Sequence, residues 1–233
     1  MHDAKTDPGP GPPPGRRAEE KPLSKRERSK REKRARILAA ARAIFSEKGF
    51  SAATVQEIAA HARVANGTVF LYARSKEELL LQVFAGDVNQ VLAEAEASLP
   101  RDDGTLAQLL HIFNAIADYH HELGAPLSAV LVRELMHGPA DIMAEPNSTF
   151  ARTDQLLIAV IDGGRERGEL SADLDSREAA AMIFSIFHWV ISQWALGRIS
   201  FGTFKDQFKS RFALSIAGMA RTGHRRPERR PGD

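Results

Sequence analysis

The stretch TVQEIAAHARVANGTVFLYARSK, residues 54–76, constrains the fold of this chain more than any other. Thr54 with Glu57, and Ser75 with Glu78, have the spacing of a capping box, in which two side chains bond backbone N–H groups at the start of a helix. A second short helix is expected between these two starts. Two short helices joined by a tight turn form a helix-turn-helix, whose second helix can enter the major groove of DNA.

The outward-facing residues of this stretch suit contact with DNA, whereas Val69 and Phe70 are expected to face inward. Asn66 and Gln56 carry amides that can pair with the edge groups of adenine. Thr68 can bond a base or a phosphate. The expected DNA contacts are Arg34, Thr54, Gln56, Ala65, Asn66, Thr68, Leu71, Tyr72 and Lys76. The alternative interpretation is a helical hairpin inside an ordinary α-helical domain, with a solvated polar face.

Residues 37–80 resemble the DNA-binding domain of the TetR family of transcriptional regulators. The resemblance is carried by four groups of residues, Phe45–Phe50, Thr54-Val55 with Ile58-Ala59, Val64–Phe70 and Ser75–Leu79. The chain departs from the family at Arg63, where Gly is usual, at Phe70, where Tyr is usual, and at Tyr72-Ala73, where His-Phe is frequent. These departures bear on which DNA sequence is read more than on DNA binding itself.

The charge of the chain is unevenly distributed. Residues 16–36 hold 11 Lys and Arg against 4 Glu, a net charge of +7, and residues 221–233 hold 5 Arg against 2 acids, a net charge of +3. The rest of the chain is acidic, so phosphate binding is expected at the ends. A solvated charge run is the alternative for the basic segment. Cysteine is absent, which fits a reducing, cytoplasmic location.

The positions of helix-breaking Pro and Gly residues and of capping boxes predict an all-α protein. Helices are expected at 24–48, 76–98, 105–122, 126–137, 148–168, 176–197 and 203–220, in addition to the helix-turn-helix. Capping boxes at Thr105 with Gln108 and at Asp175 with Glu178 are expected to fix two of the starts. The expected organisation is a disordered tail at 1–22, a DNA-binding domain with a basic N-terminal extension at 23–75, a larger helical domain at 76–220 and a basic disordered tail at 221–233.

Residues 179–197 contain no charged side chain and are long enough to span a membrane. However, Ser185, His188 and Ser192 recur along one face of the expected helix. A buried helix with a polar seam therefore fits better than a membrane span, and no membrane partner is expected.

The resemblance implies two further sites in the larger domain. A pocket for a small effector is expected, with candidate lining residues Phe84, Phe113, Asn114, Met136, Met143, His188 and Trp189. The last two helices are expected to form a four-helix bundle across a two-fold axis, with interface residues Phe184, Phe187, Ile191, Trp194, Phe204, Phe208 and Phe212. For each pocket candidate, ordinary core packing is the alternative role.

No enzyme is expected, because the sequence shows neither a Gly-rich phosphate loop nor a nucleophile elbow. No metal site or cofactor is expected either, since the histidines lack ligand spacing and cysteine is absent. The resemblance to the TetR family implies a homodimeric, ligand-responsive regulator, a repressor released from a palindromic operator in double-stranded DNA by a small molecule. The alternative is a helical dimeric scaffold or adaptor that no longer reads DNA.

Overall fold

The computed structural model describes residues 24–137 and 149–220. Every secondary-structure element longer than a single residue in these ranges is an α-helix. The only β-type pairing in these ranges is one isolated antiparallel bridge between Leu170 and Ala220. The all-α prediction is confirmed. The tails predicted at 1–22 and 221–233 lie outside the described residues.

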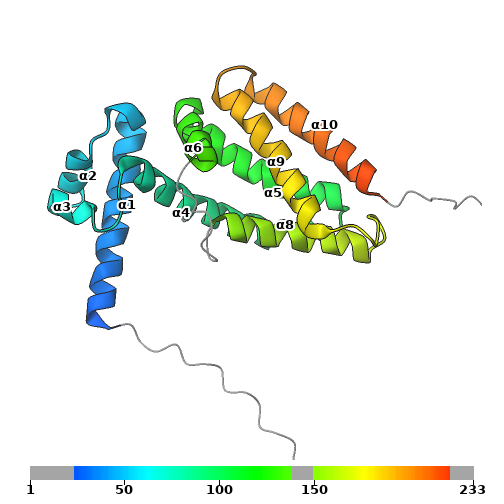
Figure 1. The fold of residues 1–233 in the computed structure, drawn as a ribbon, viewed down its shortest axis with the longest axis horizontal. Coiled ribbons are helices and arrows are strands. Elements are labelled where there is room, and N and C mark those ends of the chain that lie inside the picture. Colours follow the sequence, from blue (N-terminus) through cyan, green and yellow to red (C-terminus); the bar gives the residue numbers. More distant parts are fainter. Residues whose placement is uncertain (1–23, 138–148, 221–233) are drawn as a thin grey trace, which may run out of the picture.

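The observed helix boundaries agree with the predicted ones to within a few residues. Their bounds are α1 Lys25–Ala52, α2 Val55–His61, α3 Asn66–Val69, α4 Lys76–Ala97, α5 Thr105–Leu123, α6 Ala125–His137, α8 Thr149–Glu166, α9 Ser176–Ala195 and α10 Phe201–Met219. Helices α1 to α3 form one end of the molecule, and α4 runs from them into a bundle formed by the remaining helices (Figure 1).

Side-chain caps account for most of the observed helix starts. The box of Thr54 and Glu57 is complete, with both reciprocal bonds present at the start of α2. Ser75 accepts a hydrogen bond from the backbone N–H of Glu78 at the start of α4. At the start of α9 the carboxylate of Asp175 accepts hydrogen bonds from the backbone N–H groups of Arg177 and Glu178. Each of these bonds satisfies a backbone donor that the helix itself leaves free.

The cap predicted at Thr105 is wrong. Helix α5 does begin there, but its N-cap is Gly104, which has no side chain to bond the helix. Thr105 donates instead from its backbone N–H and its hydroxyl to the carboxylate of Glu169, at 2.7 and 2.8 Å. A side chain from the segment after α8 therefore takes the place of the local cap.

Helix α1 has two unlike parts. All of residues 24–36 are exposed, and this part projects away from the other helices (Figure 1). From Ile37 onward the helix buries one face against α2 and α4, and it kinks at Gly49, whose φ of 74° is the left-handed conformation that glycine adopts readily. The packed part fixes the direction in which the exposed part points.

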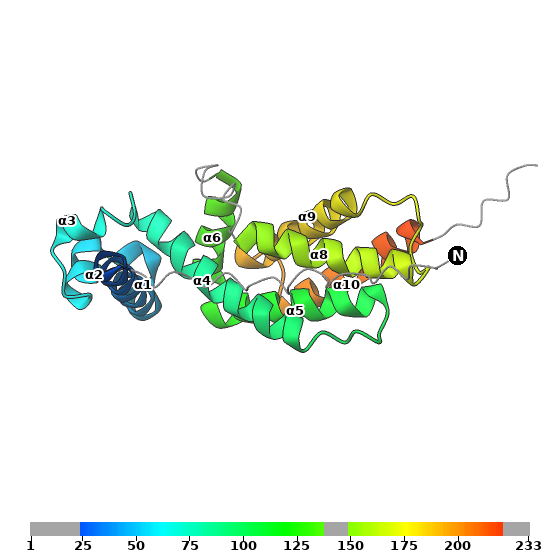
Figure 2. The same ribbon diagram turned by 90° about the horizontal axis from the view of Figure 1, so that it is seen from below.

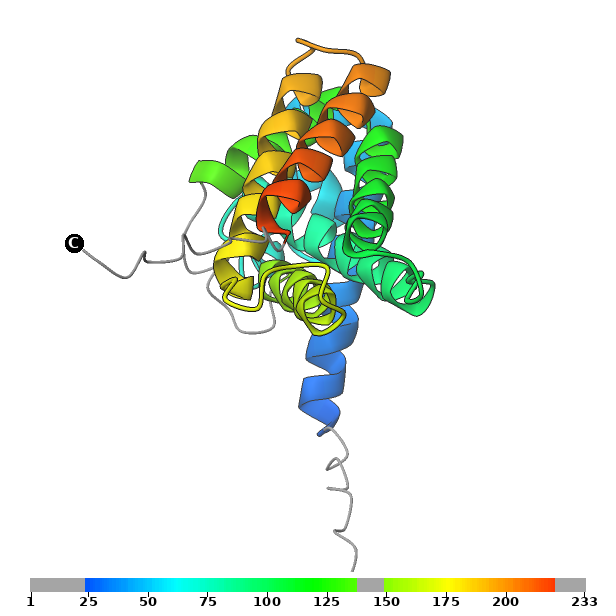
Figure 3. The same cartoon turned by 90° about the vertical axis from the view of Figure 1, so that its right-hand side faces the viewer.

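The bundle is filled by aromatic rings from α5, α9 and α10. Phe113 lies 4.7 Å from Phe187 and 5.1 Å from Phe212, measured between ring centroids. Phe204 and Phe208 extend the same cluster. Helices α9 and α10 run side by side (Figures 1 and 3), and α10 also packs against α5 (Figure 2). One chain thus covers its own aromatic core.

The predicted polar seam of α9 is not buried as a whole. Ser185 is exposed and donates to the carbonyl of Ala181 within the same helix. His188 is half-buried instead. In the part of the chain that the structure describes, no helix has the length and hydropathy that crossing a membrane requires.

Candidate nucleic-acid interface and ligand cavity

Helix α3 and its neighbourhood present unpaired polar side chains. Asn66 and Gln56 are exposed, and their amides have no hydrogen-bond partner among the described residues. Val69 holds α3 to the core with 1% of its surface exposed, and Leu71 is 77% exposed. An unpaired amide on a short, anchored helix is free to bond the edge of a base.

The inward orientation predicted for Phe70 is wrong. This ring is 50% exposed, because α3 ends at Val69 and Phe70 is already its C-cap. Since α3 has only four residues, the spacing of a longer helix does not continue through it.

The turn between α2 and α3 keeps a left-handed residue although glycine is missing. Arg63 has a φ of 54°, the only positive φ of a non-glycine residue in the described ranges. The turn is closed by a hydrogen bond from the N–H of Val64 to the carbonyl of Ala59, at 3.0 Å. The departure at Arg63 therefore leaves the turn in place, with some strain in an L-residue.

The ammonium of Lys76 is not free to bind phosphate. It donates to the carbonyls of Phe50 and Ala53 at 2.7 and 3.0 Å and lies 4.4 Å from the centroid of the Phe50 ring. These carbonyls belong to the end of α1. The prediction that Lys76 contacts DNA through its side chain is thus corrected, because that side chain joins the end of α1 to the start of α4.

Arg34 is likewise engaged within the chain. Its guanidinium donates to the amide oxygen of Gln82 at 2.9 Å, and the amide nitrogen of Gln82 donates to the carbonyl of Tyr72 at 2.8 Å. This series of bonds links α1, α4 and the residues that follow α3. It sets the position of Tyr72, whose hydroxyl has no partner in the described part of the chain.

Thr54 and Glu57 form a second internal anchor. The carboxylate of Glu57 accepts from the ammonium of Lys48 at 2.6 Å and from Thr54. These hydrogen bonds, that of Lys48 foremost, lower the pKa of Glu57 to about 2. Thr54 therefore serves first as the cap of α2, while Ala65, the N-cap of α3, is exposed without a side-chain bond.

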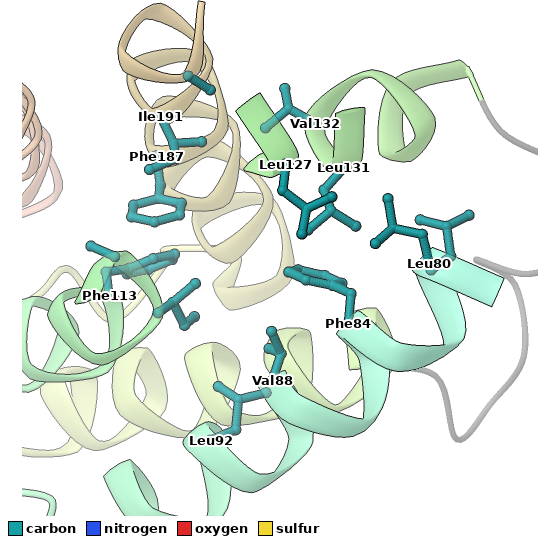
Figure 4. Close-up of a cluster of buried hydrophobic side chains, with 14 of the residues drawn as sticks. Leu80, Phe84, Val88, Leu92, Phe113, Leu127, Leu131, Val132, Phe187 and Ile191 are labelled. Atoms are coloured by element: carbon teal, nitrogen blue, oxygen red, sulfur yellow. The ribbon is translucent and has the colours of Figure 1, made fainter. Parts of the chain in front are cut away.

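A small cavity lies between α4, α5, α6, α8 and α9. A water-sized molecule can reach about 30 Å³ of it, and its walls are almost entirely apolar. Figure 4 shows Phe84 from α4 and Phe113 from α5 pointing toward its interior, with Phe187 and Ile191 from α9. Space of this size holds one or two waters and no larger molecule.

Two histidines, His120 and His188, and two threonines are the polar residues that line this cavity. Burial lowers the pKa of His120 to about 4, and burial also lowers the pKa of His188. The hydroxyl of Ser128 donates to the carbonyl of His120 and so accepts from its Nδ1, at 3.1 Å. Nε2 of His188 is buried without a partner in the described ranges. Both rings are therefore neutral near pH 7.

Only some of the residues predicted to line an effector pocket line this cavity. Phe84, Phe113 and His188 line the cavity, whereas Asn114 does not. Trp189 is 59% exposed on the outer side of α9, so its assignment to the lining is wrong. Met143 and the side chain of Met136 lie outside the described residues. Sequence reasoning missed His120, which follows Phe113 by seven residues and so shares its helix face.

A second hollow of about 260 Å³ lies where α1 meets α4, α5 and α6. Arg42 from α1 forms an ion pair with Asp87 from α4, and the hydroxyl of Tyr119 from α5 donates to Asp87 at 2.9 Å. Burial raises the pKa of Tyr119 to about 12. Phe84 lines both this hollow and the cavity, so one side chain of α4 separates them.

Most of the side chains predicted to form the dimer interface are buried within their own chain. Phe184 is half-buried, and the buried ones are Phe187, Ile191, Trp194, Phe204, Phe208 and Phe212. The exposed apolar side chains lie instead on the outer sides of α9 and α10. Met182, Trp189 and Leu196 recur there at intervals of seven residues, and Leu214 on α10 is 76% exposed. Across the described ranges no group of three or more histidines and carboxylates could hold a metal ion.

Comparison with known proteins relates this architecture to a family. Residues 37–83 match the family described as bacterial regulatory proteins, tetR family. The fatty acid metabolism regulator protein of Bacillus subtilis is 26% identical over 174 residues, which cover 72% of this chain and 87% of that protein. An uncharacterized HTH-type transcriptional regulator of Mycobacterium tuberculosis is 30% identical over 139 residues, 59% of this chain and 63% of that protein.

Solved structures share this fold. FadR of Thermus thermophilus, a repressor in complex with lauroyl-CoA, superposes with a TM-score of 0.67 at 23% identity, covering 86% of this chain and all of that one. FadR of Bacillus subtilis in complex with stearoyl-CoA gives a TM-score of 0.56 at 23% identity, covering 79% of this chain and 98% of that one. At such identities the likeness concerns the fold.

Proposed function

Because this chain belongs to the TetR family of transcriptional regulators, we propose that it is a repressor that binds double-stranded DNA and is released by a small molecule. The relatives are named as regulators, and the proposal assigns the chain no catalytic step. A regulator acts where DNA is present, so the proposal includes a cytoplasmic location.

The observation that carries the proposal is the unpaired surface of α3. Asn66 and Gln56 have no partner in the described part of the chain, whereas Lys76 and Arg34 near them are engaged in fixing α1 to α4. A scaffold that no longer reads DNA has no need of exposed amides on a helix held so firmly. Direct readout requires both the free amide and the fixed helix.

For the effector we propose a fatty acyl-CoA. Two solved structures with this fold contain lauroyl-CoA and stearoyl-CoA, and the cavity in this chain is lined by apolar side chains with neutral histidines. An acyl chain suits such walls. The space of about 30 Å³ is too small for it, so the ligand must displace the surrounding helices.

Helix α4 is the element proposed to transmit that displacement. Phe84 of α4 lines the cavity, Asp87 one turn later pairs with Arg42 of α1, and Lys76 at its start bonds the end of α1. A helix tied at two points to the DNA-binding end moves that end with it. A preference of the effector for the displaced state by about 1–3 kcal/mol lowers DNA affinity roughly five- to 150-fold.

We further propose a homodimer built on the outer sides of α9 and α10. Exposed apolar residues at intervals of seven suit helix packing across a two-fold axis, and a two-fold dimer matches a palindromic operator. Trp189→Glu with Leu214→Glu should yield a folded monomer by light scattering and circular dichroism. Gln155→Glu, on an exposed position of α8, is the control. A double variant that stays dimeric places the interface elsewhere.

Selection of duplexes from a random pool by the ligand-free protein tests the function directly. Enrichment of one palindromic sequence, bound in a salt-dependent manner, is expected. Stearoyl-CoA added to the selected complex should release the protein. Absence of any enriched duplex contradicts the proposal and favours the scaffold, while release by a different small molecule contradicts only the effector class.

A further inference from the structure

The exposed first part of α1 carries a high density of positive charge. Residues 24–36 contain eight Lys or Arg and two Glu, and no side chain among them is buried. Its helix starts at a complete capping box between Ser24 and Glu27. Glu27 with Arg31 and Arg28 with Glu32 also have the spacing of helix-stabilising charge pairs. The sequence thus keeps this part helical without packing it against the core.

A groove lies between this part of α1 and the residues after α3. It has a volume of about 790 Å³ and is lined by Lys25, Arg26, Ser29, Lys30, Lys33, Leu71 and Tyr72. Its cations recur about one turn apart, roughly 5 Å along the helix axis. Because Tyr72 lies just beyond α3, the groove continues the surface proposed to read DNA.

The charge that faces the groove is of one sign. Neither Glu27 nor Glu32 lines it, and Glu27 is bonded to the N–H of Ser24 at 2.9 Å. Lys30 and Lys33 form no ion pair within residues 24–137 and 149–220. Four unpaired cations along one side of a helix attract a polyanion, and they can release counterions from its phosphates.

The shape of the groove is set by bonds within the chain. Arg34, one residue beyond Lys33, donates to Gln82, which in turn donates to the carbonyl of Tyr72. The two walls of the groove are therefore held at a fixed separation. The free hydroxyl of Tyr72 and the exposed side chain of Leu71 offer one donor and one apolar contact to a bound strand.

We infer that this groove binds one phosphodiester strand of duplex DNA, next to the base pairs that α3 reads. The inference rests on the proposed function, and it extends the footprint of each protomer to phosphates that the recognition helix does not reach. The strand lies between Lys30 and Lys33 on one side and Tyr72 on the other. These contacts raise affinity for every sequence alike, since phosphates carry no base information.

Two variants with equal loss of charge test this inference. Lys30→Gln with Lys33→Gln removes two cations from the groove, and Arg28→Gln with Arg31→Gln removes two from the other side of the same turns, about half a turn away. Glutamine is a good helix former, so α1 should persist in both, as circular dichroism can verify. The probe is a fluorescein-labelled duplex of arbitrary sequence, about 30 base pairs long, titrated over a range of salt concentrations.

The groove variant should bind this duplex at least tenfold more weakly near 0.15 M salt. Its slope of log affinity against log salt should fall by about 0.9 for each phosphate that a protomer no longer neutralises. The control variant should retain more than half of the wild-type slope. Equal reductions in the two variants overturn the inference, because charge alone would then act without the groove.

A further arm separates this inference from the proposed function. If the groove variant binds the arbitrary duplex like wild type while Asn66→Ala still weakens binding to the selected duplex, the groove inference fails and the repressor proposal stands. If wild-type protein binds no duplex, the proposed function fails as well. Binding of the wild type to vesicles of phosphatidylglycerol in preference to the duplex also overturns the inference, since a membrane would then occupy the groove.

Discussion

The candidate DNA surface and the candidate effector cavity are built in opposite ways. Around α3 the polar groups are exposed and unpaired, as for Asn66, whereas Lys76 and Arg34 form bonds that join α1 to α4. In the bundle the polar groups are buried within aromatic walls, as for His120 and His188, and the space between them is about 30 Å³.

This difference separates a site that is ready to bind from one that must open. The DNA surface needs no rearrangement within one chain, because its bonds are already made. The cavity needs displaced helices, and a displaced α4 carries α1 with it through Arg42 and Asp87. A repressor that binds DNA in the absence of ligand and releases it in its presence has this combination.

The largest expected effect is a difference in the stability lost when a side chain is truncated in the bundle or on the candidate DNA surface. Phe84→Ala removes a buried ring between the cavity and the hollow beside α1, and it should lower the free energy of unfolding by about 3–5 kcal/mol. Leu71→Ala removes an exposed side chain, so it should change stability by less than about 0.5 kcal/mol. Denaturant titration of both variants makes the measurement. Similar decreases in the two would remove the contrast between a packed bundle and a solvated DNA surface.

Asn66→Ala should affect binding and leave stability unchanged. Removing the amide that reads a base should weaken binding to the selected duplex by roughly 1–3 kcal/mol, with little change on random DNA. Fluorescence anisotropy with both duplexes provides the measurement. An equal decrease on both would show that Asn66 contacts the backbone and reads no base.

Lowering the pH should reduce the stability of the protein through His120, which lines the cavity. The unfolded chain protonates His120 near pH 6.5, whereas the folded protein does so only near its pKa of about 4, so the unfolded state holds more protons between these values. The stability that depends on this neutral ring is complete above pH 6.5 and falls as the pH drops toward 4. Between pH 7.5 and 5.5 the decrease should be roughly 1 kcal/mol.

The matched variant for this prediction is His120→Gln. It lacks the titrating ring, so its stability should depend less on pH over the same interval, whatever its absolute stability. Thermal unfolding at several pH values compares the two proteins. An unchanged pH slope in the variant would assign the acid sensitivity to other groups.

The smallest expected effect concerns the turn before α3. Arg63→Gly relieves the left-handed strain of an L-residue but adds freedom to the unfolded chain, so a net gain of about 0.5 kcal/mol is expected. Arg63→Ala keeps a Cβ and should bring no gain. Should glycine destabilise the protein, the Arg63 side chain must make a stabilising contact that outweighs its strained backbone.

Local sequence signals predicted the helices well, because capping residues such as Thr54 and Asp175 act within one turn. Partners distant in sequence were not predictable in this way. Nothing near Lys76 shows that its ammonium bonds the carbonyl of Phe50, 26 residues earlier. The same holds for Thr105, whose partner Glu169 is 64 residues away.

The candidate sites in the bundle were harder to predict for a related reason. An apolar helix such as α9 has rings on several sides, and the sequence does not say which side its own chain covers. Phe187 and Trp189 are two residues apart, yet one is buried in the aromatic core and the other is exposed. Their roles depend on how α5 and α10 pack against α9, which only the tertiary structure provides.

One titration tests the account most directly. The ligand-free protein is bound to its selected duplex and stearoyl-CoA is then added, with free coenzyme A as the control. The account predicts tight binding without ligand, and a fall in affinity of at least fivefold with the acyl-CoA alone. Failure of the ligand-free protein to bind duplex DNA, or tighter binding with the acyl-CoA present, would contradict it.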